Sequence, residues 1–215
     1  MTRNFNDGLR ESMHAPVFRP IFGKPVPIVS SPETLAFLAR RRSAPALTLV
    51  APGPSDEQIS TLLTIAARVP DHGKLAPWRF VVIKGEAKAA FANGLERIAV
   101  GRPDKAKLVA KLAKLRTPPL CLTVVSRPVA SEIPPWEQHL SAGAACTLLV
   151  IAAQAMGYGA NWITDWYAYD VDALALLGLA EGEKVAGFVH IGTPGETPLE
   201  RVRPDVAAIT SLWEG

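Results

Sequence analysis

The sequence predicts a single α+β layered domain, because stretches rich in β-formers alternate with helical segments of very unequal length and no repeat is visible. A length of 215 residues is enough for one well-packed domain and leaves little room for a second. Hydrophobic residues make up 48% of the chain and charged residues 20%, as in an ordinary globular protein. We expect an extended arm over residues 1–30, the domain over 31–194 and a tail over 195–215.

Helix start signals define the first part of the domain. Ser31 is a good N-cap and Pro32 suits the first helical position, so a helix is expected to lead directly into the run Arg40–Ser43. Ser55 and Gln58 form a capping-box pattern ahead of a second amphipathic helix. A polar loop follows that helix.

The later elements follow from apolar periodicity and from breaks at proline or glycine. The most apolar stretch, 142–156, is shorter than the roughly 20 residues that a bilayer demands, so we expect a buried helix and no membrane span. Expected strands cover 78–83, 120–125, 160–163 and 184–192, and expected helices cover 86–98, 104–115, 136–156 and 170–177.

Charge, cysteines and histidines narrow the function classes. The net charge of +3 is small, and aromatic residues do not alternate with basic ones, so we expect no nucleic-acid partner. Cys121 and Cys146 lack the paired spacing of a zinc site, and the four histidines show no metal-binding pattern. The N-terminal region lacks the continuous apolar stretch of a secretory signal, which predicts a cytoplasmic protein.

Conventional catalytic motifs are missing from the sequence. There is no GxSxG elbow and no GxxxxGK[ST] loop, and the Gly157–Gly159 fragment of a dinucleotide fingerprint follows a helix instead of a strand. We therefore expect no catalytic side chain. A flavin enzyme would fit, because its ring performs the redox chemistry while the protein supplies binding, orientation and charge.

Two basic segments are candidates for such a site. Guanidinium groups of Arg40–Ser43 could fork onto a phosphate, although a solvated helix C-terminus favoured by the helix dipole is the alternative. The segment Ala67–Trp78 joins a helix to a strand, where loops commonly form sites. Its alternative is a polar loop with Asp71 as a turn residue and Trp78 in the core.

Motifs at compatible spacing from Leu35 to Pro194 resemble the nitroreductase family of FMN enzymes. They are Arg41-Arg42-Ser43, Val69-Pro70 and Pro77-Trp78-Arg79-Phe80. The Arg-x-Pro-Asp-His variant at 68–72 and the runs 136–143, 157–162 and 191–194 are similar to the short YdjA-like branch. The resemblance implies a central, mostly antiparallel sheet flanked by helices.

Carried over residue by residue, the resemblance implies two sets of binding residues. The first set holds FMN, with Arg68 and His72 reaching the flavin that is bound mainly by the partner subunit of a homodimer: Arg41, Arg42, Ser43, Arg68, His72, Trp162, Ile163 and Thr164. The second set lies near the nicotinamide of NADH or NADPH: Ala152, Ala153, Gln154, Ala155, Met156 and Gly157.

Two departures from the family pattern stand out. His72, Lys74 and Ala76 occupy the stretch where the family has Asn and Gln, which leaves the partner of flavin N5 open. The segment 163–165 replaces the Arg-Ser that often follows Trp162 in the branch, so a cationic contact is lost or replaced. Arg201 and Arg203 of the tail either approach a phosphate or lie exposed.

The resemblance implies an NAD(P)H oxidoreductase that reduces nitroaromatic, quinone or other electron-poor acceptors by ping-pong hydride transfer through flavin N5. Small residues over 141–145 allow another helix to approach closely, as in a two-fold dimer, or simply a tightly packed core helix. One alternative is a flavin-binding protein without reductase turnover. Another is an interaction domain without flavin, in which the arginines lie on the surface.

Overall fold

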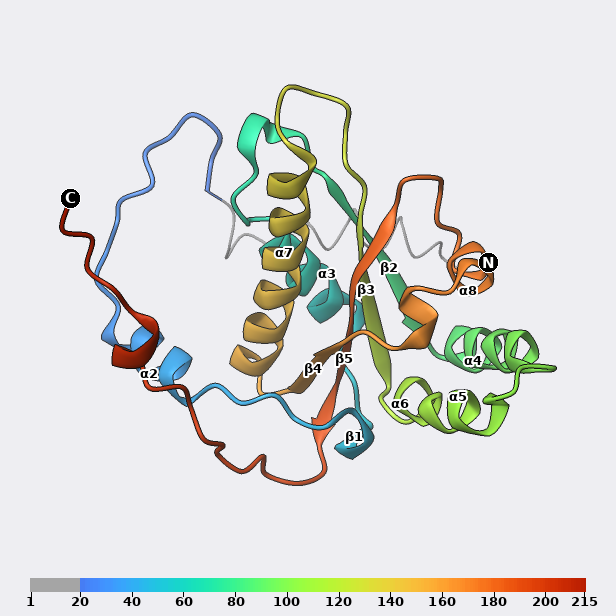
Figure 1. The fold of residues 1–215 in the computed structure, drawn as a ribbon. Coiled ribbons are helices and arrows are strands. Elements are labelled where there is room, and N and C mark those ends of the chain that lie inside the picture. The colour runs from blue at the N-terminus through green and yellow to red at the C-terminus, as the bar shows by residue number, and fades with distance from the viewer. Residues whose placement is uncertain (1–19) are drawn as a thin grey trace.

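The computed structural model describes residues 20–215, so residues 1–19 of the expected arm lie outside the described part. Five strands form one antiparallel sheet in the order β1-β5-β3-β2, and β4 also pairs with β5 (Figure 1). The strands are β1 (Leu49–Val50), β2 (Trp78–Lys84), β3 (Leu120–Ser126), β4 (Gly159–Ile163) and β5 (Lys184–Pro194). The α+β class expected from the sequence is confirmed.

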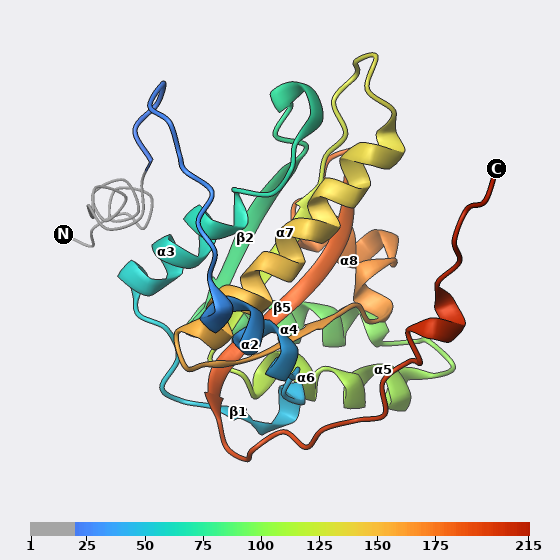
Figure 2. The ribbon, with the colours of Figure 1, turned by 90° about the vertical axis from the view of Figure 1, so that its left-hand side faces the viewer.

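Helices cover both faces of this sheet (Figure 2). One face carries α3 and α7, and the other carries α4, α5, α6 and α8. The α-helices are α2 (Pro32–Arg40), α3 (Asp56–Ala66), α4 (Glu86–Ala99), α5 (Lys105–Lys111), α6 (Ala113–Arg116), α7 (Pro135–Ala155) and α8 (Val171–Leu176). Short 3₁₀ turns are η1 (Ala46–Thr48), η2 (His72–Lys74), η3 (Trp166–Ala168) and η4 (Ala207–Ile209).

The alternation of side chains along β3 divides the core into two layers. Leu122 and Val124 pack toward α7 and α3, whereas Cys121 packs toward α4 and η3. This division follows from the period of two in a strand. β3 lies between β2 and β5 with helices on both faces, so all of its side chains are buried, and its sequence is apolar apart from Thr123 and Ser126.

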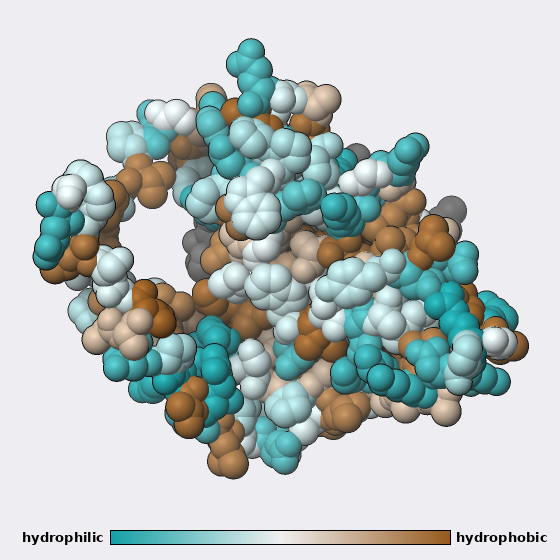
Figure 3. Space-filling view, in the orientation of Figure 1, coloured by the Kyte–Doolittle hydropathy of each residue, from teal (hydrophilic) through white to brown (hydrophobic). Residues whose placement is uncertain are grey.

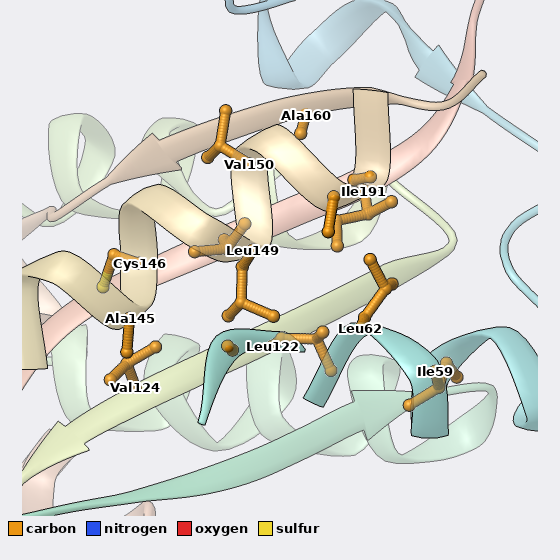
Figure 4. Close-up of a cluster of buried hydrophobic side chains, with 14 of the residues drawn as sticks. Ile59, Leu62, Leu122, Val124, Ala145, Cys146, Leu149, Val150, Ala160 and Ile191 are labelled. Atoms are coloured by element: carbon orange, nitrogen blue, oxygen red, sulfur yellow. The ribbon is translucent and has the colours of Figure 1, made fainter. Parts of the chain in front are cut away.

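Helix α7 lies close against the sheet because small residues face it. Ala145 and Cys146 are fully buried, and Leu149 fills the space between α7 and the strands, where it meets Leu122 and Ile191 (Figure 4). The helix predicted over 136–156 is confirmed within one residue at each end. The capping box predicted at the start of α3 is also present.

Two local features differ from the sequence expectation. The helix expected over 104–115 is two helices, because the chain tightens at Leu112, whose N–H bonds the carbonyl of Val109 at 3.0 Å. The two-residue strand β1 was not expected from the sequence. It is defined by its pairing with Thr193 and Pro194 of β5, which lie far away along the chain. Neither feature has a local sequence signal.

Polar side chains are buried on the face of the sheet that α4 covers. His190 is fully buried and neither of its ring nitrogens has a hydrogen-bond partner, and the hydroxyl of Tyr167 is likewise unpartnered. Burial, reinforced by the positive charges of Lys88 and Lys114, lowers the pKa of His190 to about 3. His190 is therefore neutral in the folded protein at neutral pH.

We expect His190→Leu to reduce the loss of stability in acid. The pKa of His190 is depressed from 6.5 to about 3 on folding, so the unfolded chain binds more protons between these values. Stability that is present above pH 6.5 is then lost as the pH falls, by at most about 1.4 kcal/mol per pH unit. Urea unfolding of wild type and variant at pH 7 and pH 5 measures the difference. Equal pH slopes in wild type and His190→Leu would contradict the prediction.

Candidate functional site

The residues Arg41–Ser43, which follow α2 and are here called the arginine turn, lie at a pocket of about 320 Å³, the arginine pocket. Within the turn, a guanidinium nitrogen of Arg41 lies 3.5 Å from the hydroxyl of Ser43, so cation and hydroxyl share one small region. The lining holds three guanidinium groups and no carboxylate. Its residues are Phe37, Arg40, Arg41, Arg42, Ala44, Gln154, Gly157, Tyr158, Gly159, Pro194, Thr197 and Pro198.

Gln154 brings the end of α7 into this pocket. Its Nε2 donates to the carbonyl of Arg42, which fixes the amide, while its buried Oε1 has no hydrogen-bond partner. An unsatisfied buried acceptor costs about 1–3 kcal/mol. A ligand that carries both an anion and hydroxyl groups would satisfy the guanidiniums and this acceptor together. The phosphate and ribityl hydroxyls of FMN have that chemistry, so the residues present fit the cofactor.

The loop between α3 and β2 is held in an unusual backbone conformation. The carboxylate of Asp71 accepts from the backbone N–H groups of Leu75 and Ala76, at 3.1 and 2.9 Å. Lys74 and Ala76 both have positive φ, at 56° and 46°. Non-glycine residues rarely adopt this region, and such strain is concentrated at functional sites. Asp71 is thus the turn residue of this loop and Trp78 packs partly against the core, as the alternative interpretation expected. The strained backbone at Lys74 and Ala76 is the feature that a simple polar loop does not require.

The same loop and the beginning of α7 line a second pocket, the histidine pocket, of about 340 Å³. The His72 Nδ1 lies 2.8 Å from a carboxylate oxygen of Glu137. The hydroxyl of Ser141 donates to the carbonyl of Pro70 at 2.7 Å and accepts from the indole N–H of Trp78 at 3.0 Å. Arg68 is exposed just before this loop.

Glu137 and Ser141 are functional candidates that the sequence argument did not select. Both occurred in the 136–143 run that carried the resemblance, but only their positions on one face of α7 bring them to His72 and Pro70. A helical spacing of four residues was the available signal.

Trp162 and Ile163 end β4, and Thr164 follows them. The neighbouring Asn161 donates from Nδ2 to the carbonyl of Ala44, directly after the arginine turn, at 2.8 Å. The indole N–H of Trp162 donates to the carbonyl of Ala186 at 3.2 Å. A Cβ at Gly187 would collide with this indole, so glycine there lets the ring lie against β5. Ile163 is half-buried, and Thr164 is exposed with its hydroxyl 2.9 Å from that of Tyr169.

The side chains of residues 152–157, the segment expected near the nicotinamide, point in different directions around the end of α7. Ala152 and Ala153 are buried in the core, whereas Gln154 and Gly157 line the arginine pocket. Ala155 is exposed and Met156 packs partly against the core. The role of this segment stays a prediction.

The two pockets lie at opposite ends of α7. Leu140 and Ser141 line the histidine pocket, and Gln154 lines the arginine pocket. The α7 residues that line the histidine pocket run from Glu137 to Ala144, so Gln154 lies 10 to 17 positions farther along, which is about 15–26 Å at 1.5 Å per residue.

Residues 20–215 contain no group of three or more His, Cys, Asp or Glu side chains arranged to hold a metal ion. In the same range, no helix has both the length and the apolar character needed to cross a membrane.

Comparison with known proteins identifies the family. Residues 38–193 match the model of the nitroreductase family. The chain is 38% identical over 165 residues to YdjA of Escherichia coli strain K12, a candidate NAD(P)H nitroreductase by its name, and the match covers 75% of this chain and 88% of YdjA.

Solved structures share the fold at lower sequence identity. A nitroreductase-like family protein from Bacillus cereus superposes with a TM-score of 0.76 at 20% identity, covering 89% of this chain and 100% of that one. A nitroreductase with bound FMN from Bacteroides fragilis NCTC 9343 has a TM-score of 0.67 at 20% identity, covering 86% and 100%. Together with the match over residues 38–193, these findings show that the chain belongs to the nitroreductase family.

Proposed function

We propose that the chain is an FMN-dependent NAD(P)H oxidoreductase that reduces nitroaromatic, quinone or other electron-poor acceptors. The observation that carries the proposal is the arginine pocket, in which three guanidiniums adjoin a buried, unpartnered amide oxygen of Gln154. Family membership and the FMN in the Bacteroides fragilis structure support the choice of cofactor. Use of NAD(P)H as donor implies a cytoplasmic location.

In this proposal the protein binds and orients FMN, which supplies the hydride and electron chemistry when bound. Arg41 and Arg42 bind the phosphate, with Ser43 adding a hydroxyl. The Oε1 of Gln154 accepts from a ribityl hydroxyl, which removes the cost of leaving this atom without a partner. Trp162, whose indole ring lies against β5 at Gly187, shapes the edge of the flavin site.

The length of α7 supports a site shared between two subunits. The α7 residues that line the arginine and histidine pockets of one chain are about 15–26 Å apart along the helix, so one chain does not bring both pockets to the same part of a flavin. Thr147 is exposed and lies seven residues from both Leu140 and Gln154. A two-fold axis near Thr147 would place the arginine pocket of one chain beside the partner subunit's His72.

The exposed surface of α7 is suited to this dimer. Trp136 and Leu140 are 69% and 55% exposed, although both are large and apolar. Farther along the same helix, Gly143 and Ala144 are partly exposed and small enough for close approach of a second helix. A second copy would bury this surface.

The proposed activity is tested by steady oxidation of NADPH or NADH with a quinone acceptor. We expect continuous turnover, with parallel double-reciprocal lines because donor and acceptor use the site in turn. The purified protein should release FMN, identified by mass. A yellow protein that shows no turnover with either donor would instead support a flavin-binding protein without reductase activity.

We expect Arg41→Ala to weaken FMN retention. Loss of a hydrogen bond to a charged group costs about 1.5–3 kcal/mol, which raises the Kd by roughly 10- to 150-fold. Flavin content after gel filtration and a fluorescence titration of the apoprotein measure the effect. Arg97→Ala, an exposed site on α4, is the matched control. A full flavin complement in Arg41→Ala would rule out its phosphate role.

We expect Thr147→Arg to give monomers with little FMN, because the proposed axis would bring two like charges together. Light scattering coupled to gel filtration gives the oligomeric state, and absorbance gives the flavin content. Ala106→Arg adds the same charge at an exposed site on α5 and should stay dimeric. A dimeric, fully loaded Thr147→Arg protein would show that α7 is not at the axis.

A further inference from the structure

The loop that contains His72 is tied to α7 at two points one helical turn apart. Nδ1 of His72 lies 2.8 Å from a carboxylate oxygen of Glu137. Four residues farther along α7, the hydroxyl of Ser141 donates to the carbonyl of Pro70 at 2.7 Å. Because positions four apart share a face of a helix, α7 presents both groups to the same loop, and the imidazole is held in one place.

The backbone on either side of His72 adds to this constraint. The carboxylate of Asp71 accepts from the backbone N–H groups of Leu75 and Ala76. Gly73, the next residue after His72, has a φ of 75°, which residues with a side chain rarely adopt. The imidazole therefore projects from a compact turn with a defined backbone.

The contact with Glu137 gives the two ring nitrogens of His72 different roles. Glu137 lies in the first turn of α7, where the positive end of the helix dipole stabilises an ionised carboxylate. An ionised carboxylate only accepts hydrogen bonds, so Nδ1 carries a proton and donates it to Glu137. Nε2, on the opposite side of the ring, is then the atom that gains and loses a proton. The adjacent negative charge stabilises the imidazolium form.

The histidine pocket joins this pair to an apolar wall. Leu140 and Ala144 of α7 line the pocket together with His72 and Glu137. In the orientation of Figure 1 the beginning of α7 and the loop lie at the top, where hydrophilic and hydrophobic residues lie side by side on the surface (Figure 3). A quinone has an apolar ring for such a wall and an oxygen for a hydrogen-bond donor.

Glu137 is the charge that acts most directly on the imidazole. The ionisable side chains that line this pocket and the smaller one beside it are Asp71, His72 and Glu137. The carboxylate of Asp71 is bonded to the backbone of its own turn. Three further charged side chains on this loop and on the segment before α7 are exposed: Arg68, Lys74 and Glu132.

We propose that His72 donates a proton to the electron acceptor, and that Glu137 is the positioning residue of this imidazole. Two-electron reduction of a quinone adds a hydride and a proton. The hydride brings both electrons and leaves a negative oxygen on the product. The Nε2–H bond of the imidazolium breaks as an O–H bond forms at that oxygen, which gives the hydroquinone and a neutral imidazole. Solvent then returns a proton to Nε2.

This inference rests on the proposed function, and on the dimer that would bring the histidine pocket to the partner subunit's flavin. Trp136 and Leu140 beside the pocket are exposed in the single chain, and a second copy that buries them would limit the access of water. A side chain is then the nearest source of the proton. The inference departs from the sequence-based expectation that no side chain is catalytic.

The test compares an acceptor that needs a proton with one that does not. Benzoquinone takes up a hydride and a proton, whereas ferricyanide takes up electrons alone. Because donor and acceptor use the site in turn, kcat/KM for the acceptor reports on the acceptor half of the reaction. Rates are expressed per bound FMN, so that loss of flavin does not count. We expect His72→Asn to lower kcat/KM for benzoquinone about 100-fold and to leave that for ferricyanide unchanged.

Glu137→Gln keeps an acceptor for Nδ1 but removes the charge. We expect it to lower kcat/KM for benzoquinone about tenfold, with no change for ferricyanide. His139→Asn is the matched control for His72, because its ring contacts Ser126 and lies outside the histidine pocket. Glu86→Gln, in the first turn of α4, is the matched control for Glu137.

A second measurement needs neither flavin nor turnover. In the apoprotein at about pH 9, where the imidazole is neutral, ¹⁵N chemical shifts should place the ring proton of His72 on Nδ1. In Glu137→Ala a larger fraction should carry it on Nε2.

Three results would overturn the inference while the proposed function stands. They are an equal loss with both acceptors in His72→Asn, no loss with benzoquinone, and a ring proton on Nε2 in the wild-type apoprotein. If the wild-type protein reduces neither acceptor, both the inference and the proposed function are wrong.

Discussion

The close packing of α7 against the sheet is the constraint on which the other features depend. Alanines at positions 142, 145 and 153 and the thiol of Cys146 face the strands, so the helix axis can lie near β3 and β5 without leaving a void. This contact fixes both ends of the helix. One end then places Glu137 and Ser141 beside the loop of His72, and the other places Gln154 against the arginine turn.

Sequence patterns predicted the helices and strands better than the tertiary contacts between them. Ser55 with Gln58, and the apolar run before Gly157, are local signals, because capping and helical periodicity involve residues within a few positions. The strand β1 and the break at Leu112 depend on contacts with distant residues, and local patterns do not report those. The expectation of a mostly antiparallel sheet likewise came from the family resemblance and not from spacing.

The candidate site shows the same limit. The arginine turn and the Arg68–His72 loop were visible as dense polar segments, and the structure places each beside a pocket. Their separation along α7 could not be read from the sequence, because it depends on which helix faces which loop. Gln154 was assigned to the nicotinamide by resemblance, and this role stays a prediction; in the structure the residue lines the arginine pocket, with its amide bonded to the carbonyl of Arg42. Its amide within the apolar run 142–156 was the only local indication.

The position of the arginine pocket explains why it is so rich in guanidinium groups. Many phosphate sites use the N-terminus of a helix, where backbone N–H groups and the positive end of the dipole attract an anion. Here α2 ends at Arg40 and α7 ends at Ala155, so both helices direct their negative, C-terminal ends toward the pocket. A phosphate bound in this pocket would gain nothing from either helix dipole. Side-chain cations would have to supply the electrostatic attraction that holds it. The same dipoles stabilise the arginines in the folded protein, which makes a dense cationic turn compatible with the fold.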